Sequence, residues 1–257
     1  MGMKENAFAY IDAHRSEMLK MWEELVSIDS GSDYKPGVDK VVARVADVLT
    51  AMGGKTRIVE HANAGNAVVS EFGDCANKPF IVLTGHLDTV FSNPEETKAR
   101  PFTIKDGRAY GPGALDMKGG VTLATFGLQA LLAEGFDKYA FKVVLAGDEE
   151  TGHKSSDLAE TMMAEFKGAT AAFDFETGFM NDNVVVERKG FYRFSLETYG
   201  RSVHAGNEPQ NGRNAIVELA HKAVDLDALT DWETGTTLTW ARLKAARLPM
   251  RCRATPR

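Results

Sequence analysis

The sequence predicts an α/β protein, in which a mostly parallel sheet flanked by helices is followed by a smaller, partial α+β unit. Three observations predict this. Over residues 1–189, short β-rich apolar runs alternate with longer amphipathic segments, as in proteins built from βα units. Several of these runs lead directly into loops that carry acidic residues. Over residues 190–239 the pattern changes to one alternating run, one amphipathic segment and one further short run.

Each element follows from its local pattern. Apolar residues at near-helical spacing predict helices at 5–28, 38–52, 118–134 and 156–166, the second ended by Gly53 and Gly54. Short runs bounded by Gly, Asn or Pro predict strands at 66–72, 80–84, 141–146, 169–174 and 184–187. Further along, the pattern predicts a strand in 191–200, a helix at 212–229 and a strand at 235–239, with a boundary between the two units near 188–191.

Composition excludes several classes of protein. The 257 residues are 44% hydrophobic and 26% charged, which is typical of a folded globular chain. No apolar run approaches the roughly 20 residues that a membrane span needs, and the amphipathic N-terminus lacks the apolar core of a signal peptide, so no membrane partner is expected. A net charge of −6 without a basic stripe argues against nucleic acid as a partner. The two cysteines form neither a disulfide framework nor a CxxC pair, so we expect a cytoplasmic protein.

Four loops carry the residues that could bind a metal ion or transfer a proton. They contain the sequences TGHLDTV, GPGALDMKGG, GDEETG and DFETG, which supply His86, Asp88, Asp116, Glu149, Glu150, Asp174 and Glu176. Because carboxylates gathered at neighbouring strand ends repel one another, they need a compensating positive charge. A divalent cation supplies it, and histidine with Asp or Glu is a zinc-type ligand set. The sequence therefore predicts a metal site at this edge of the sheet.

The spacing within these loops suggests individual roles. Asp88 lies two residues after His86, so in an extended backbone both side chains point the same way, and the carboxylate could hold the second ring nitrogen. The adjacent Glu149 and Glu150 point in different directions, so one could bind metal while the other acts as general base. Two cations bridged by one carboxylate would fit metal-assisted hydrolysis. An aspartic hydrolase would leave the histidine motif unexplained, and the loop pattern of a calcium-binding module is absent.

Together with GRSVHAGNEPQNGRNAI, these motifs resemble the co-catalytic di-zinc exopeptidase family over roughly residues 8–239. That family includes glutamate carboxypeptidase, acetylornithine deacetylase, succinyl-diaminopimelate desuccinylase and aminoacylase, and the last motif is most similar to the glutamate carboxypeptidase branch. The resemblance implies two divalent cations, zinc first and cobalt or manganese as alternatives. It also implies a role for each site residue: His86 and Glu176 on one zinc, Asp116 bridging both ions beside a cis peptide to Met117, Glu150 on the second zinc, Glu149 as general base and Asp88 orienting His86.

For residues 190–239 the resemblance implies a lid that also forms a homodimer. His204 would reach the partner subunit's active site and polarise the scissile carbonyl, and Asn214 would lie near the same site to bind substrate. Each role has a simpler alternative: His204 could lie on a surface loop, and Asn214 could cap the helix that follows it. Asp174 is the alternative to Glu176 as a ligand.

The resemblance stops at Thr239. No histidine follows His221, so the family's last ligand for the second zinc is missing, as is an arginine for the substrate carboxylate, and the second site is expected to be incomplete. Residues 240–257 are rich in arginine and contain no acidic residue. Read in another frame, the nucleotides that encode this region could give a family-like continuation from Leu238. We therefore interpret this tail as the product of a frameshift; the alternative is a real basic extension.

The function that the sequence predicts is metal-dependent hydrolysis of an amide or peptide bond next to a free carboxylate, in a small peptide or an N-acyl amino acid. The alternative is a catalytically inactive, truncated fragment that binds at most one metal ion.

Overall fold

The computed structural model describes residues 2–178, 183–204 and 206–240. The chain divides into two compact units, Met1–Val184 and Val185–Arg257, so the division lies a few residues before the expected boundary. Residues 241–257, to which most of the frameshift hypothesis applies, lie outside the described part of the chain. Within the described residues, we find no helix that combines the length and the apolar character needed to cross a bilayer.

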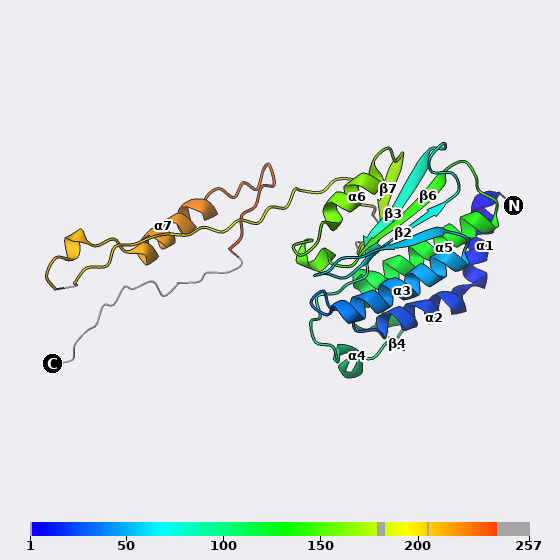
Figure 1. The fold of residues 1–257 in the computed structure, drawn as a ribbon, viewed down its shortest axis with the longest axis horizontal. Helices are drawn as coiled ribbons and strands as arrows, with labels where there is room; N and C mark the ends of the chain where they lie inside the picture. The colour runs from blue at the N-terminus through cyan, green and yellow to red at the C-terminus, as the bar shows by residue number, and fades with distance from the viewer. Residues whose placement is uncertain (1, 179–182, 205, 241–257) are drawn as a thin grey trace. The chain divides into compact units, whose positions relative to one another are not determined.

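The first unit is built on a five-stranded sheet with the strand order β1-β2-β6-β3-β7 (Figure 1). Its strands are β1 (Lys55–Val59), β2 (Ala67–Phe72), β3 (Phe80–His86), β6 (Ala140–Ala146) and β7 (Ala171–Asp174). Strand β3 pairs in parallel with both β6 and β7, whereas β1 and β2 add an antiparallel edge. The α/β class is confirmed, and the parallel strands are the ones that lead into the acidic loops.

Helices cover both faces of this sheet (Figure 1). One face carries α1 (Met3–Ala13), α2 (Arg15–Val26), α3 (Lys35–Ala51) and α5 (Gly119–Ala133). The other face carries α6 (Leu158–Phe166). Because side chains alternate along a strand, successive residues serve different cores. Val68 and Leu83 pack toward the four-helix side. Val69 and Val82 pack on the side that carries α6.

The first predicted helix is divided into two. The break lies at His14, whose ring nitrogen Nδ1 lies 2.8 Å from the carbonyl oxygen of Tyr10 and whose ring stacks on that of Tyr10. The backbone N–H of His14 still bonds the carbonyl oxygen of Tyr10 at 3.1 Å, so the interruption consists of the non-helical backbone angles of His14, φ −101° and ψ 15°. The sequence pattern also missed β1 and a small hairpin of β4 (Thr103–Lys105) and β5 (Arg108–Tyr110), which follows the short α4 (Glu96–Ala99).

The second unit contains α7 (Ala215–Asp227), within the range predicted for a helix. The strands expected at 184–187, 191–200 and 235–239 are wrong. The structure describes all of these residues, and among them only Thr236 takes part in a bridge, with Asp231. The alternation is present in the sequence, but a strand also needs a hydrogen-bonded partner, and none is described here. The aromatic residues of this stretch, including Phe191 and Tyr192, are exposed.

Candidate metal centre

The parallel pairing of β3 with β6 and β7 brings three loops to one edge of the sheet. His86 is the last residue of β3 and lies opposite Ala146 at the end of β6. Thr84 lies opposite Asp174 at the end of β7, and its carbonyl oxygen accepts a hydrogen bond from Phe175 at 3.1 Å. Because parallel strands end together, the loops after them meet, as is usual for ligand sites in α/β sheets.

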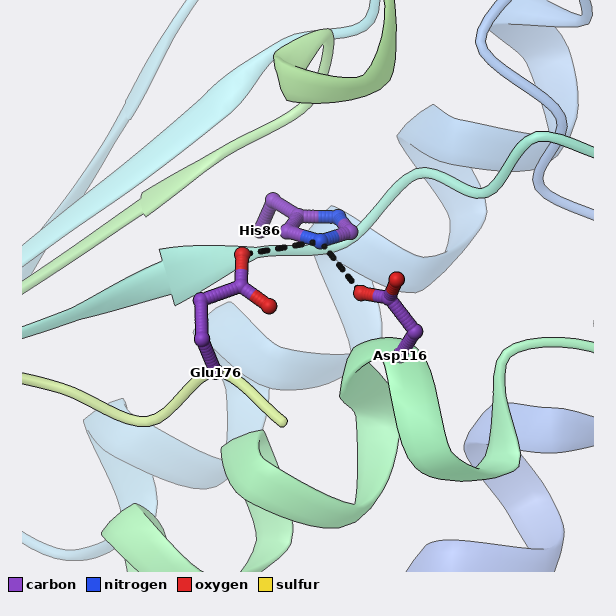
Figure 2. A group of neighbouring side chains, drawn as sticks. All are labelled: His86, Asp116 and Glu176. Carbon is purple, nitrogen blue, oxygen red and sulfur yellow. Dashed lines mark hydrogen bonds and ion pairs between the residues drawn. The ribbon is translucent and has the colours of Figure 1, made fainter. Parts of the chain in front are cut away.

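Three of the predicted ligands converge at this edge (Figure 2). The Nε2 atom of His86 lies 3.0 Å from Oδ1 of Asp116 and 3.3 Å from Oε1 of Glu176. One donor atom from each residue lies within 4.8 Å of the other two. One imidazole nitrogen and two carboxylate oxygens form a donor set that suits zinc, so the residues fit the expected ion. Glu176, and not its rival Asp174, belongs to this group.

The opposite side of the His86 ring faces Asp88. Nδ1 of His86 lies 3.0 Å from the carbonyl oxygen of Asp88 and 3.3 Å from its Oδ1. Both neighbours of Nδ1 are oxygen acceptors, which fixes a proton on Nδ1 and directs Nε2 toward the carboxylates. The imidazole of His86 is only 1% exposed, so its orientation is set entirely by these contacts.

Asp88 also reaches the loop after β6. Its Oδ1 accepts a hydrogen bond from the backbone N–H of Glu149, and its Oδ2 accepts one from that of Glu150, both at 3.1 Å. The side chain of Asp88 is fully buried. This carboxylate therefore couples the orientation of the His86 ring to the backbone of the two glutamates.

Asp116 comes from a helical turn, η1 (Ala114–Lys118), that precedes α5. The peptide bond between Asp116 and Met117 is cis, as the resemblance implied. The buried Met117 lies against β3, and its Sδ accepts the backbone N–H of His86 at 3.0 Å. Gly85 makes this approach possible, because a Cβ at that position would lie 2.1 Å from Cε of Met117. The turn thus presents Asp116 toward solvent, with its side chain 56% exposed.

The two adjacent glutamates differ in position. Oε2 of Glu149 lies 3.9 Å from Nε2 of His86, which places it beside the ligand group. Glu150 is not part of that group. Burial, reinforced by neighbouring carboxylates, raises the pKa of Glu149 and raises that of Glu150 to about 7. Carboxylates with raised pKa values are stronger bases near neutral pH, which suits the predicted chemistry.

The carboxylates around His86 change the pKa of its imidazole. Burial alone lowers its pKa, but hydrogen bonds and charge interactions with Asp88 and Glu176 outweigh burial and raise the pKa to about 11. The hydrogen bond with His86 in turn lowers the pKa of Glu176 against the effect of its burial. Without a cation, a proton on His86 is therefore what balances the clustered carboxylates.

The other two predicted site residues belong to the second unit. His204 is exposed, and its Nδ1 accepts the backbone N–H of Gly206 at 3.1 Å. Asn214 caps α7, because its side-chain oxygen accepts hydrogen bonds from the backbone of Ile216 at 3.0 Å and Val217 at 3.3 Å. The capping alternative is thus realised for Asn214, and its predicted role in substrate binding stays a prediction, as does the role of His204.

Two residues close to the site were not assigned a role from the sequence. Lys118 follows the Asp116 turn, is fully buried and donates from Nζ to the carbonyl oxygen of Ile28 at 2.9 Å. Burial lowers its pKa to about 7. Ser32 donates from Oγ to Oδ2 of Asp88 at 2.6 Å. Lys118 lies inside the GPGALDMKGG motif, so a role for it could have been predicted from the sequence. Ser32 lies in a short polar run that is typical of an ordinary loop.

The sequence is similar to those of known proteins. The family model described as "Peptidase family M20/M25/M40" matches residues 82–246. Carboxypeptidase G2 of Pseudomonas sp. (strain RS-16) is 27% identical over 89% of this chain and 55% of its own length. Succinyl-diaminopimelate desuccinylase of Delftia acidovorans is 30% identical over 86% of this chain and 59% of its own length. The chain thus spans little more than half the length of these relatives.

Solved structures share the fold. Human carnosine dipeptidase 1 superposes with a TM-score of 0.60 at 22% identity, covering 88% of this chain and 53% of its own. The M20 family metallo-carboxypeptidase of Sulfolobus solfataricus superposes with a TM-score of 0.59 at 20% identity, covering 82% of this chain and 49% of its own. With a family model that matches well over half of its residues, the chain belongs to peptidase family M20/M25/M40.

Proposed function

We propose that this chain carries the metal centre of a hydrolase that cleaves an amide or peptide bond next to a free carboxylate, with zinc as the preferred ion. The observation that carries the proposal is the convergence of His86, Asp116 and Glu176 at the carboxyl ends of parallel strands. Membership of a peptidase family supports a hydrolytic use of that centre. His86, Asp116 and Glu176 would hold one ion, and Asp116 would be shared with a second ion bound by Glu150.

A bound divalent cation supplies Lewis acidity, which makes a water molecule acidic enough to give up a proton near neutral pH. The chain supplies the remaining functions. Asp88 holds the proton on Nδ1 of His86, so that Nε2 stays available for the ion. Glu149 accepts the proton of the attacking water, because it lies beside the ligand group and burial raises its pKa.

The second unit would complete the substrate side of the reaction. In this proposal His204 of a dimer partner polarises the scissile carbonyl, and Asn214 lies near the same substrate. The partners are then a small peptide or N-acyl amino acid and a second copy of the chain. Relatives are named for different reactions, including those of a carboxypeptidase, a dipeptidase and a desuccinylase, so the proposal stops at the class of substrate. The cysteine pattern supports a cytoplasmic location.

The test is a hydrolase assay on the zinc-loaded chain, with acyl-glutamates and N-acetyl amino acids as substrates. We expect turnover that Glu149→Ala abolishes, while Glu160→Ala on the exposed surface of α6 leaves it unchanged. Turnover that survives Glu149→Ala would contradict the assigned mechanism.

A second candidate function is metal binding without catalysis. It is favoured by one observation: in the described part of the chain only one group of residues has the geometry to hold an ion, and Glu150 lies outside it. Stoichiometric zinc binding with no turnover on any of these substrates would support this candidate over the first.

A further inference from the structure

The segment between α2 and α3 contacts two of the three segments that carry the ligands. The carbonyl oxygen of Ile28 accepts the hydrogen bond of Lys118, which follows the Asp116 turn. The carbonyl oxygen of Ser30 accepts the backbone N–H of Thr89 at 2.9 Å, and the N–H of Ser32 donates to the carbonyl oxygen of Thr89 at 3.0 Å. Residues 28–32, which we call the strap, therefore lie alongside the loop that follows His86.

Main-chain contacts fix the path of the strap beside Thr89. Gly31 forms an isolated parallel bridge with Thr89. A Cβ at Gly31 would lie 2.1 Å from the carbonyl oxygen of Phe91, so only glycine lets the strap pass this close to the loop after His86. These main-chain contacts hold the strap beside the loop, and the hydroxyl of Ser32 adds to them one longer hydrogen bond, to the carbonyl oxygen of Thr89 at 3.3 Å.

The hydroxyl of Ser32 instead acts on Asp88. Its Oγ donates to Oδ2 of Asp88 at 2.6 Å, a short contact typical of a hydrogen bond to an ionised carboxylate. The same Oδ2 accepts the backbone N–H of Glu150, while Oδ1 accepts that of Glu149 and faces His86. Because Asp88 is fully buried, water cannot replace a lost donor at this carboxylate.

We propose that Ser32 is a positioning residue of the metal centre, which fixes the rotation of the Asp88 carboxylate and through it the His86 ring and the loop of Glu149 and Glu150. Ser32 acts on the centre through Asp88, because its hydrogen bonds within the described residues are with Asp88 and Thr89. The inference rests on the proposed function in that it requires a metal centre at His86, but it does not depend on the substrate.

The experiment measures zinc affinity by calorimetric titration of the metal-free chain with Zn²⁺, together with the melting temperature of the metal-free chain. Removing a residue that hydrogen-bonds a metal ligand typically weakens metal binding by 10- to 100-fold. Ser32 bonds Asp88, which in turn contacts the ligand His86, so we expect the lower end of this range, a loss of about 10-fold, for Ser32→Ala. The matched control is Ser92→Ala, which removes a hydrogen bond of the same type, from Ser92 to Asp33 at 3.2 Å, on the exposed surface.

A second pair of variants separates the hydroxyl from the space it fills. Ser32→Thr keeps the hydroxyl and Ser32→Val has the same shape without it, so any cost of the added methyl group is common to both. We expect the threonine variant to bind zinc about 10-fold more tightly than the valine variant, with both variants still melting cooperatively in the metal-free state.

The proposal is overturned if Ser32→Ala binds zinc within twofold of the unsubstituted chain, or if the threonine and valine variants bind equally. It is also overturned if zinc affinity falls only in variants whose metal-free form no longer melts cooperatively, since that is the behaviour of a purely structural residue. An unsubstituted chain that binds no zinc would overturn the proposed function as well, whereas tight zinc binding unaffected at Ser32 would overturn only this inference.

Discussion

Loading the metal-free chain with zinc should release a proton from His86. The carboxylates around the ring raise the pKa of His86 to about 11, so its Nε2 is protonated at pH 7.5 in the absence of metal. Nε2 is also the atom that faces Asp116 and Glu176, so an ion can bind there only after the proton leaves. Glu176 contributes no proton, because the pKa of its carboxylate is lowered.

The magnitude follows from this competition. With one proton displaced per ion at His86, the apparent zinc affinity should rise about tenfold for each pH unit between pH 6.5 and pH 9, which corresponds to roughly 1.4 kcal/mol per unit. Glu150, with a pKa of about 7, would add up to a further half proton near pH 7 if it also becomes a ligand. The metal-free chain should behave in the opposite sense. Because the folded-state pKa of His86 is raised, its contribution to stability is complete below pH 6.5 and declines as pH rises toward 11.

The assay is calorimetric titration with Zn²⁺ in buffers of different ionisation enthalpy at a single pH, which counts the protons released per ion. The matched control is His153→Gln, because His153 pairs with Asp148 at 2.7 Å outside the ligand group and should leave the count unchanged. A count near zero at pH 7.5, or an affinity independent of pH, would refute the assignment of His86 as a protonated ligand.

Three further predictions test other parts of the account. Glu149→Gln should lower kcat about 10²- to 10⁴-fold while zinc affinity stays within a few-fold, and a variant that keeps full turnover would remove Glu149 as the base. Glu176→Gln should weaken zinc binding at least about tenfold by titration, whereas Asp174→Asn should not, and the reverse order would reassign the ligand. Asn214→Ala should lower the free energy of unfolding by about 1 kcal/mol in urea titration through loss of the α7 cap, and an unchanged value would argue against the cap.

The sequence predicted those parts of the fold in which local pattern and burial coincide. Strands β3 and β6 are almost entirely buried and were found as apolar runs. Strand β1 was missed because it lies at the sheet edge with mostly exposed side chains, so no apolar alternation marks it. In residues 191–200 the alternation is clear, but a pattern in one segment does not reveal whether a partner strand pairs with it.

The candidate site shows the same division. His86, Asp116 and Glu176 were predicted because each follows a recognisable strand or turn. The parallel pairing of β3 with β7 brings His86 and Glu176 together, and the turn before α5 adds Asp116. Ser32 was not predicted, because its importance lies in one contact with Asp88, 56 residues away. Contacts between distant segments depend on the tertiary fold and leave no periodic signal in either segment.

The most direct test of the account is the zinc content of the folded chain after equilibration with excess Zn²⁺ and removal of the unbound metal. We predict at least one zinc ion per chain, and loss of that ion in His86→Ala protein that still melts cooperatively. A folded, unsubstituted chain that retains no zinc, or a His86→Ala variant that retains as much as the unsubstituted chain, would contradict the metal centre.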